Sequence, residues 1–222
     1  MQKVTHSEYI AQKKPLAKQL LAKLNEKYQY ASVLITDNYE KGYRASRSGV
    51  AISATNAFGG KGMIVKVYDG KGYAEYSTNE ITAENLPEIE REIEQQLMNP
   101  ANFIPEGTEE AEYKCISDEP CTLCEATDYE IHPRDEKLIE TVTALREKAV
   151  KADERILDAI TGFNYQEYHK LFLSANRELE QSVLYSTGIM ALVAAKGEEI
   201  KQSFRGFSNL GGAELLDKMG SA

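Results

Sequence analysis

Three cysteines and one histidine supply the most distinctive chemistry in this sequence. Cys115, Cys121 and Cys124 are followed by His132, with five residues between the first two cysteines and two between the last pair. A Cys-x-x-Cys pair on one tight turn is the usual half of a zinc site. Cys115 and His132 could complete a tetrahedral set, and the nearby carboxylates would favour a cation. These four residues are the candidate metal ligands, for a structural zinc ion.

Two other interpretations of the same residues stay open. The five-residue spacing after Cys115 is not a standard zinc spacing, and the second pair of the usual four-cysteine pattern is missing. A redox Cys-x-x-Cys motif belongs at a helix start near a strand–helix–strand unit, and Cys121 follows Pro120 without that context. The default interpretation is therefore a solvated acidic segment that carries free thiols.

The rest of the chain contains no complete catalytic set. None of its three histidines is followed by glutamate, so the chain has no His-Glu-x-x-His metal helix. His169, in YQEYHKLFLS, is expected to be a half-exposed strand residue rather than a general base, because no motif places a nucleophile beside it. The glycine-rich run 59–62 is expected to begin a strand rather than to cradle a phosphate. We therefore expect no catalytic residue here and no peptidase activity from this chain alone.

The charge of the chain is concentrated in one segment. The 222 residues carry 26 basic and 35 acidic side chains, and residues 106–130 hold nine of the acids and only one lysine. The remainder is nearly neutral, which argues against direct binding to nucleic acid. The acidic segment contains few apolar side chains, so we expect a mobile surface loop unless a cation holds it.

Cysteine usage and hydropathy bear on the compartment. An odd number of cysteines fits a reducing cytoplasm better than secretion, and the first residues contain no apolar stretch typical of a signal peptide. No run of 18 apolar residues is present, so we expect no membrane segment. The sequence thus predicts a cytoplasmic protein.

The N-terminal part of the chain predicts helix, then sheet, then helix. Leucines at helical spacing indicate a helix over 15–27, with Pro15 in its first turn. An antiparallel meander is predicted for 29–78, and its Asp69-Gly70 pair is a hairpin signal. A second helix follows a cap at Thr82 or Asn85.

The C-terminal part repeats this arrangement after an irregular excursion over 99–134. Asp135 is expected to cap a third helix, which could continue past Asp153 to Ile160. A second meander is predicted for 163–207, with turns at Asn176, Gly188 and Gly197. The order of elements predicts an α+β fold with mostly antiparallel sheet.

Several passages resemble one known family. GGKGMIVKVYDGKGYAEYSTNEITAENL matches a pattern of glycine, short strand, Asp-Gly and Gly-aromatic-Ala before a helix. The upstream YQYASVLITDNYEKGYRASRSG, the charged IHPRDEKLIETVTALREKAVKADERI and the distal KLFLSANRELEQSVLYSTGIMALVAAKGEEIKQSFRGFSNLGGAELL fit the same family. Together they resemble the N-terminal half of the TldD/PmbA family, peptide-processing metalloproteases once called modulators of DNA gyrase. The resemblance covers nearly all of 6–217.

The resemblance implies a domain organisation and an activity. Residues 1–222 would form one N-terminal-type domain, and the protease half, absent from this chain, would carry the zinc motif of two histidines and a glutamate. The zinc-bound water of that half would cleave unfolded or small peptides inside the cavity of a homo- or heterodimer. This domain would help to build the dimer and the substrate chamber. A peptide could add as a strand to an exposed edge, for which 50–56 and 182–186 are candidates.

Two alternatives belong to other classes of protein. The chain could be a non-catalytic partner subunit, like the PmbA branch, which lacks the histidine pair. It could also modulate gyrase or DNA by direct contact, although its near-neutral body and acidic segment argue against contact with DNA. A His-Glu-x-x-x-His helix in the sequence beyond residue 222 would favour the peptidase over the partner.

Overall fold

The computed structural model describes residues 1–54, 60–70, 72–98, 119–129 and 133–221. Within these ranges the elements follow one another along the chain as β1 (Gln2–Lys3), α1 (Glu8–Lys27), β2 (Tyr30–Ser46), β3 (Gly49–Ala54), β4 (Lys61–Tyr68), β5 (Tyr73–Thr78), α2 (Leu86–Met98), β6 (Cys121–Ala126), β7 (Asp128–Tyr129), α3 (Asp135–Lys151), β8 (Ile156–Ser174), β9 (Arg177–Lys196), β10 (Glu199–Leu210) and α4 (Leu215–Gly220). The α+β class predicted from the sequence is confirmed.

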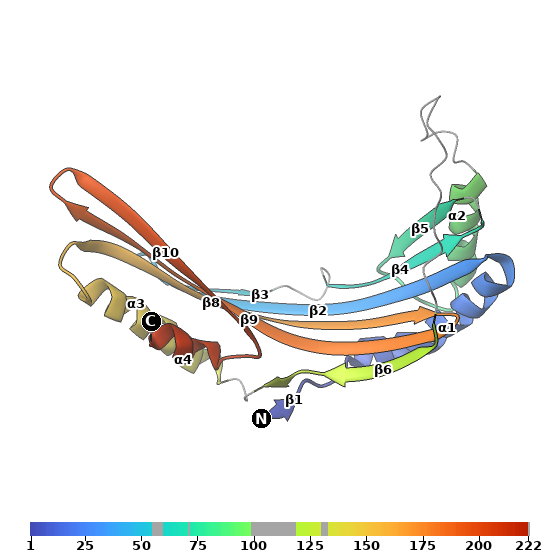
Figure 1. Cartoon of the computed structure of the whole chain (residues 1–222), viewed down its shortest axis with the longest axis horizontal. Coiled ribbons are helices and arrows are strands. Elements are labelled where there is room, and N and C mark those ends of the chain that lie inside the picture. The colour runs from blue at the N-terminus through green and yellow to red at the C-terminus, as the bar shows by residue number, and fades with distance from the viewer. Residues whose placement is uncertain (55–59, 71, 99–118, 130–132, 222) are drawn as a thin grey trace.

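Three long strands form the centre of one curved sheet. β2, β8 and β9 are 17, 19 and 20 residues long and run the length of the molecule (Figure 1). The strand order is β10-β9-β8-β2-β4-β5. Of the three long strands, β2 and β9 flank β8, and each pairs along its outer edge with two other strands, one after the other. β2 pairs with β4 and then with β3, and β9 pairs with β6 and then with β10.

The helices cover the same face of this sheet at its two ends. Odd-numbered side chains of β2 and β8 point to this face, because side chains alternate along a strand. Near α1 and α2 they form a first core with residues such as Val33, Ile35 and Leu171. Near α3 and α4 they form a second core around Tyr43 and Phe163. Two hydrophobic cores are therefore built on one continuous sheet.

The first helix begins earlier than predicted. α1 starts at Glu8, and the Ser7 side chain caps it by accepting a hydrogen bond from the Ile10 N–H at 3.1 Å. Pro15 is consequently inside the helix rather than in its first turn, so that prediction was wrong. A proline cannot donate to the carbonyl four residues back, and here Ala11 and Pro15 are both exposed, where water can replace the lost donor.

The third helix differs from its prediction at both ends. Asp135 is its first residue and accepts hydrogen bonds from Lys41 and Tyr43 instead of capping the helix. The helix stops at Lys151, and Ile156 and Ile160 belong to β8. Apolar residues at helical spacing also fit a strand when the run is short, which explains the error.

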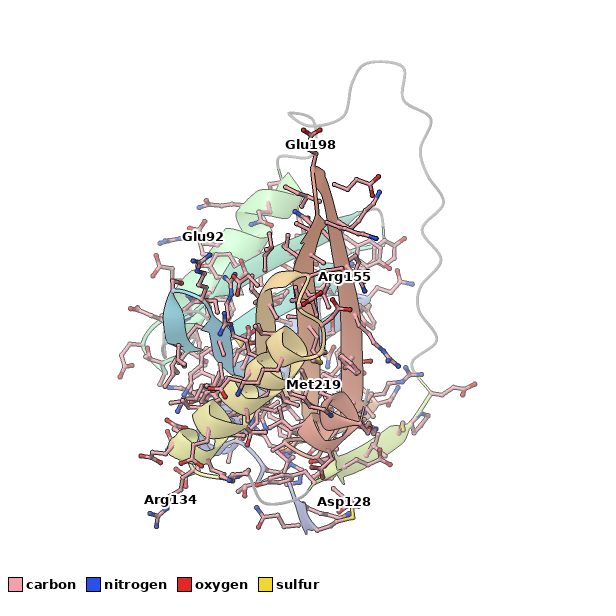
Figure 2. All side chains as sticks on the ribbon, turned by 90° about the vertical axis from the view of Figure 1, so that its left-hand side faces the viewer. Glu92, Asp128, Arg134, Arg155, Glu198 and Met219 are labelled. Carbon is pink, nitrogen blue, oxygen red and sulfur yellow. The ribbon has the colours of Figure 1, made fainter. Side chains whose placement is uncertain are left out.

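Gly188 does not form the expected turn. It lies inside β9, opposite Phe163 of β8 and Phe207 of β10. A Cβ on Gly188 would lie 2.4 Å from the Sδ of Met219 in α4, so the glycine makes room for this side chain. Met219 lies where α4 meets the strands (Figure 2). The turns at Asn176 and Gly197 separate strands as predicted.

The acidic excursion contains a strand that the sequence did not indicate. β6 pairs in parallel with β9, from Cys121 opposite Arg177 to Ala126 opposite Ser182. The predictions of an irregular excursion and a mobile loop are therefore wrong for β6. Main-chain hydrogen bonds to an available strand edge require no apolar side chains. Residues 106–118 and 130 of the acidic segment lie outside the described residues.

No helix in the described ranges is long and apolar enough to cross a membrane.

Candidate functional site

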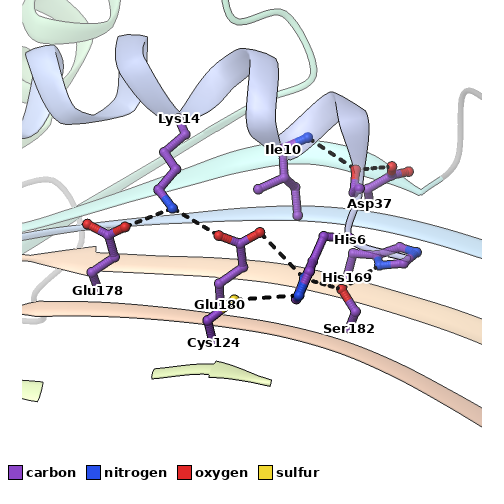
Figure 3. Close-up of polar contacts among 10 residues, drawn as sticks. His6, Ile10, Lys14, Asp37, Cys124, His169, Glu178, Glu180 and Ser182 are labelled. Carbon is purple, nitrogen blue, oxygen red and sulfur yellow. Dashed lines mark hydrogen bonds and ion pairs between the residues drawn. The ribbon is translucent and has the colours of Figure 1, made fainter. Parts of the chain in front are cut away.

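A polar seam separates the two cores at the middle of the helix-covered face. It consists of His6, Asp37, Glu167, His169, Glu180 and Ser182, most of which appear in Figure 3. Neither core includes any of these residues. Buried polar groups persist only where they find hydrogen-bond partners, so their contacts decide what the seam can do.

Strand register brings three of these residues into one row. Asp37 of β2 lies opposite His169 of β8, and His169 lies opposite Ser182 of β9. Their side chains share the helix-covered face because directly paired residues point the same way. The row is a direct consequence of the strand pairing, although its members are far apart in sequence.

His6 reaches the row from the segment that precedes α1. The Val4 N–H donates to the Thr127 carbonyl at 2.9 Å, which fixes this segment beside β6 and β7. At the other end, the Ser7 hydroxyl donates to the Asp37 carboxylate at 2.6 Å while it caps α1. His6 is thus held between two anchored neighbours.

The two histidines share one serine. Nδ1 of His6 and Nδ1 of His169 each lie 3.0 Å from the Ser182 hydroxyl oxygen. Glu180 lies 3.6 Å from Nδ1 of His6, and Glu167 lies 3.5 Å from Nε2 of His169. Because a hydroxyl has a single proton, Ser182 can donate to only one of the two rings.

The two carboxylates fix the direction of this network. Each carboxylate is best placed beside a protonated ring nitrogen, which puts one proton on Nδ1 of His6 and one on Nε2 of His169. His6 then donates to Ser182, and Ser182 donates to Nδ1 of His169. With the proton of a neutral ring on Nδ1, Nε2 of His6 can accept a proton, and it lies 3.5 Å from the Cys124 sulfur.

Ion pairs hold Glu180 in position. Lys14 of α1 lies 2.9 Å from Glu180 and 2.7 Å from Glu178, and Lys18 also pairs with Glu178. Hydrogen bonds from Lys14 and Lys18 lower the pKa of Glu178 below its ordinary value. These contacts join α1 to β9 at the end of the seam.

Accessibility separates the two candidate nucleophiles. Ser182 is 1% exposed, so a substrate cannot reach its hydroxyl. The residue Cys124 is exposed, and its sulfur lies 3.5 Å from Nε2 of His6. Any covalent chemistry at this site therefore falls to the cysteine.

The predicted cysteine ligands lie on an extended strand rather than a turn. Residues three apart on a strand are about 10 Å apart and point to opposite faces, so Cys121 and Cys124 do not form the expected tight turn. Cys115 and His132 lie outside the described residues. Within the described ranges, no group of three or more metal-ligating side chains occurs. The four-ligand zinc site remains a prediction.

His169 is placed differently from its prediction. It is 7% exposed rather than half-exposed, because it lies on the helix-covered face between Asp37 and Ser182. His6, Glu180 and Ser182 were not predicted from the sequence as members of a site. No local motif joins them, and the only available signal was an N-terminal histidine before a Ser7 cap.

Comparison with known proteins gives structural matches only. No family model matches the sequence, and no curated protein matches it. Three solved structures are similar over 93% of this chain. They are proteins proposed to be modulators of DNA gyrase from Bacteroides thetaiotaomicron (16% identity, TM-score 0.65) and Thermotoga maritima (11%, 0.68), and TldE from Thermococcus kodakarensis (12%, 0.61).

These matches define the class of fold. The chain spans about half of each matched structure, between 46% and 48% of its length. The resemblance to the TldD/PmbA family is confirmed at the level of the fold.

Proposed function

We propose that this chain is the assembly and substrate-chamber domain of a TldD/PmbA-type metallopeptidase that acts on unfolded or small peptides. The observation that supports it is the uncovered face of the long sheet. In the described ranges, all helices that pack on the three central strands lie on the other face. An extended sheet with one apolar face open suits a chamber wall that binds peptides of varied sequence.

The open face is apolar over much of its length. Even-numbered residues of β8 and odd-numbered residues of β9 point to it, because these strands pair in that register. Even-numbered residues of β10 pair with odd-numbered residues of β9 and share this face. Its exposed members include Ile189 at 44% and Phe204 at 77%. A hollow on the same face is lined by Leu34, Tyr168, Lys170, Phe172, Leu179 and Gln181. This hollow is the proposed contact for a peptide side chain.

Of the two predicted strand edges, 50–56 is supported as far as Ala54, and its residues 55 and 56 lie outside the described residues. β3 pairs only with β2 in the described part of the chain, and all six of its residues are exposed. The other candidate, 182–186, was wrong, because β9 is paired on both sides: Ser182 with His169 and Ala126, and Tyr185 with Gln166 and Leu210. An incoming peptide strand would therefore add at β3.

Peptide binding tests the proposal. We expect a fluorescently labelled unfolded peptide to show a rise in anisotropy with the purified chain, and Leu179→Ser in the hollow to weaken it several-fold. The matched control is Leu210→Ser, because Leu210 is 69% exposed on the same face but lies outside the hollow. Absence of binding, or equal loss in both variants, would contradict a peptide-binding face.

The activity and partner belong to the same proposal. The chain would contribute no zinc ligand to the catalytic centre, so purified alone it should not cleave casein or short peptides when zinc is added. Mixed with a TldD/TldE-type subunit, it should co-elute as a dimer. Chelator-sensitive cleavage by the isolated chain would overturn this assignment of roles.

A further inference from the structure

We propose that Cys124 is a covalent modification site that reacts with small disulfides, with His6 as its base and Glu180 as a positioning residue. This inference rests on the seam alone and does not depend on the proposed peptidase role. It assigns a chemical activity to residues that have no part in the proposed peptide contact.

The geometry joins an accessible thiol, a base and a carboxylate. Cys124 is exposed, and its sulfur lies 3.5 Å from Nε2 of His6. Glu180 lies on the far side of the ring, 3.6 Å from Nδ1, and is itself held by Lys14. Figure 3 shows these groups in sequence from thiol to carboxylate. Nucleophile, base and orienting carboxylate are the parts that an activated cysteine requires.

The hydrogen-bond network keeps the base in its useful form. Glu180 favours a proton on Nδ1 of His6, and the Ser182 hydroxyl accepts a hydrogen bond from that proton. Ser182 can accept it because its own proton goes to His169, which Glu167 holds in the matching tautomer. The result is an Nε2 lone pair directed at the thiol.

The reaction is a thiol–disulfide exchange. Nε2 of His6 takes the proton of the Cys124 thiol, and the thiolate attacks one sulfur of a small disulfide RS–SR. A new bond forms between Cys124 and that sulfur while the original S–S bond breaks. The departing RS⁻ takes the proton from the imidazolium and leaves as RSH, so atoms and charges balance.

Cys121 provides an internal comparison. It is exposed on the same strand, three residues earlier, and it points to the opposite face. Within the described ranges it is a free cysteine, and the contact with His6 is made by Cys124 instead. The two cysteines therefore differ in the His6 contact while sharing strand, exposure and the surrounding acidic sequence.

Single-cysteine variants test the proposal. The Cys115→Ser/Cys121→Ser variant leaves Cys124, and Cys115→Ser/Cys124→Ser leaves Cys121. We would measure reaction with neutral 4,4′-dithiodipyridine at pH 7 by absorbance. Because the Cys124 sulfur has Nε2 of His6 3.5 Å away to take its proton, we expect Cys124 to react about tenfold faster than Cys121 or more. Equal rates in the native state would overturn the proposal, and both thiols should react equally in urea.

Variants of the base separate activation from simple accessibility. His6→Gln in the Cys124-only protein should reduce its rate to that of Cys121, and the same change in the Cys121-only protein should have no effect. Glu180→Gln should give an intermediate rate. Circular dichroism would verify folding. A rate for Cys124 that is unchanged by His6→Gln in a folded protein would show that His6 is not the base.

Discussion

The hydroxyl groups of Tyr43 and Tyr165 occupy positions in which ionisation is unfavourable. Tyr43 is 1% exposed and donates to Asp135 at 2.7 Å, and its ring stacks on that of Tyr165. Burial, followed by the hydrogen bond to Asp135, raises the pKa of Tyr43 far above its ordinary value of 10. Burial, followed by the charge of Tyr39, raises the pKa of Tyr165 in the same way.

These shifts predict a loss of stability in alkali. When the pKa is higher in the folded state, stability is fully present below the unfolded value near 10 and is lost as pH rises above it. We therefore expect most of the 13 tyrosines to ionise first and Tyr43 and Tyr165 to ionise with unfolding. An absorbance titration at 295 nm followed with circular dichroism checks this, and Tyr43→Phe should make the alkaline loss shallower. Ionisation of all tyrosines near pH 10 without unfolding would contradict it.

Gly188 gives a second prediction at the scale of one residue. Gly188→Ala places a Cβ against Met219, which is 1% exposed, so we expect a loss of about 1–3 kcal/mol in the free energy of unfolding. In a Met219→Ala background the same change should cost clearly less, because the space is free. Urea denaturation of the four proteins measures the coupling. Equal costs in both backgrounds would show that Met219 is not the cause.

The candidate site shows where prediction from sequence stops. Cys124 was noticed because its spacing from Cys121 matched a motif, but the motif implied a turn and the segment is a strand. His6 and Ser182 carry no local signal of their contact, since strand pairing and the anchored N-terminal segment bring them together. A site made by long-range register cannot be found from local spacing.

Among the elements, α3 contributes an apolar stripe to the second core, which it shares with α4. Leu138 is fully buried there, with Val142 and Leu145 on the same side. Leu138→Ala should lower the free energy of unfolding by about 2–5 kcal/mol through lost burial and a residual cavity. Leu157→Ala is the control, because Leu157 is 56% exposed. Similar urea midpoints for the two variants would contradict this account of the core.

Elements with a strong periodic signal were predicted well, and those made by pairing were not. The α2 stripe and the Asp69-Gly70 hairpin are local features, and both are present: Gly70 has a φ of 97°, which glycine adopts readily. β6 has a mostly exposed pattern and exists because β9 offers it a free edge. An alternation of apolar and polar residues arises only where one face of a strand is buried. β6 is mostly exposed, so its sequence lacks this signal.

At the scale of the whole molecule, the open face predicts self-association when nothing covers it. The β9–β10 hairpin of the sheet has Glu198 at its tip (Figure 2). Its strand β10 contains Phe204, which is 77% exposed. We expect concentration-dependent dimers in sedimentation velocity, and Phe204→Lys should shift them toward monomer. Arg205→Lys, its neighbour on the opposite face, should leave association unchanged. A protein that stays strictly monomeric at high concentration would contradict self-association through the open face.

The strand order also determines the sequence in which the strands can pair during folding. β8, β9 and β10 are joined by short turns, so they can pair almost as soon as each is made. β2 meets β8 only after a long stretch of chain, with Ser32 opposite Ser174 and Ala45 opposite Thr161. During synthesis one edge of β2 therefore stays unpaired until β8 has been made. We expect the docking of the two meanders to be the slow step of folding. Until then, the unpaired edge of β2 is where binding of a chaperone would best prevent aggregation.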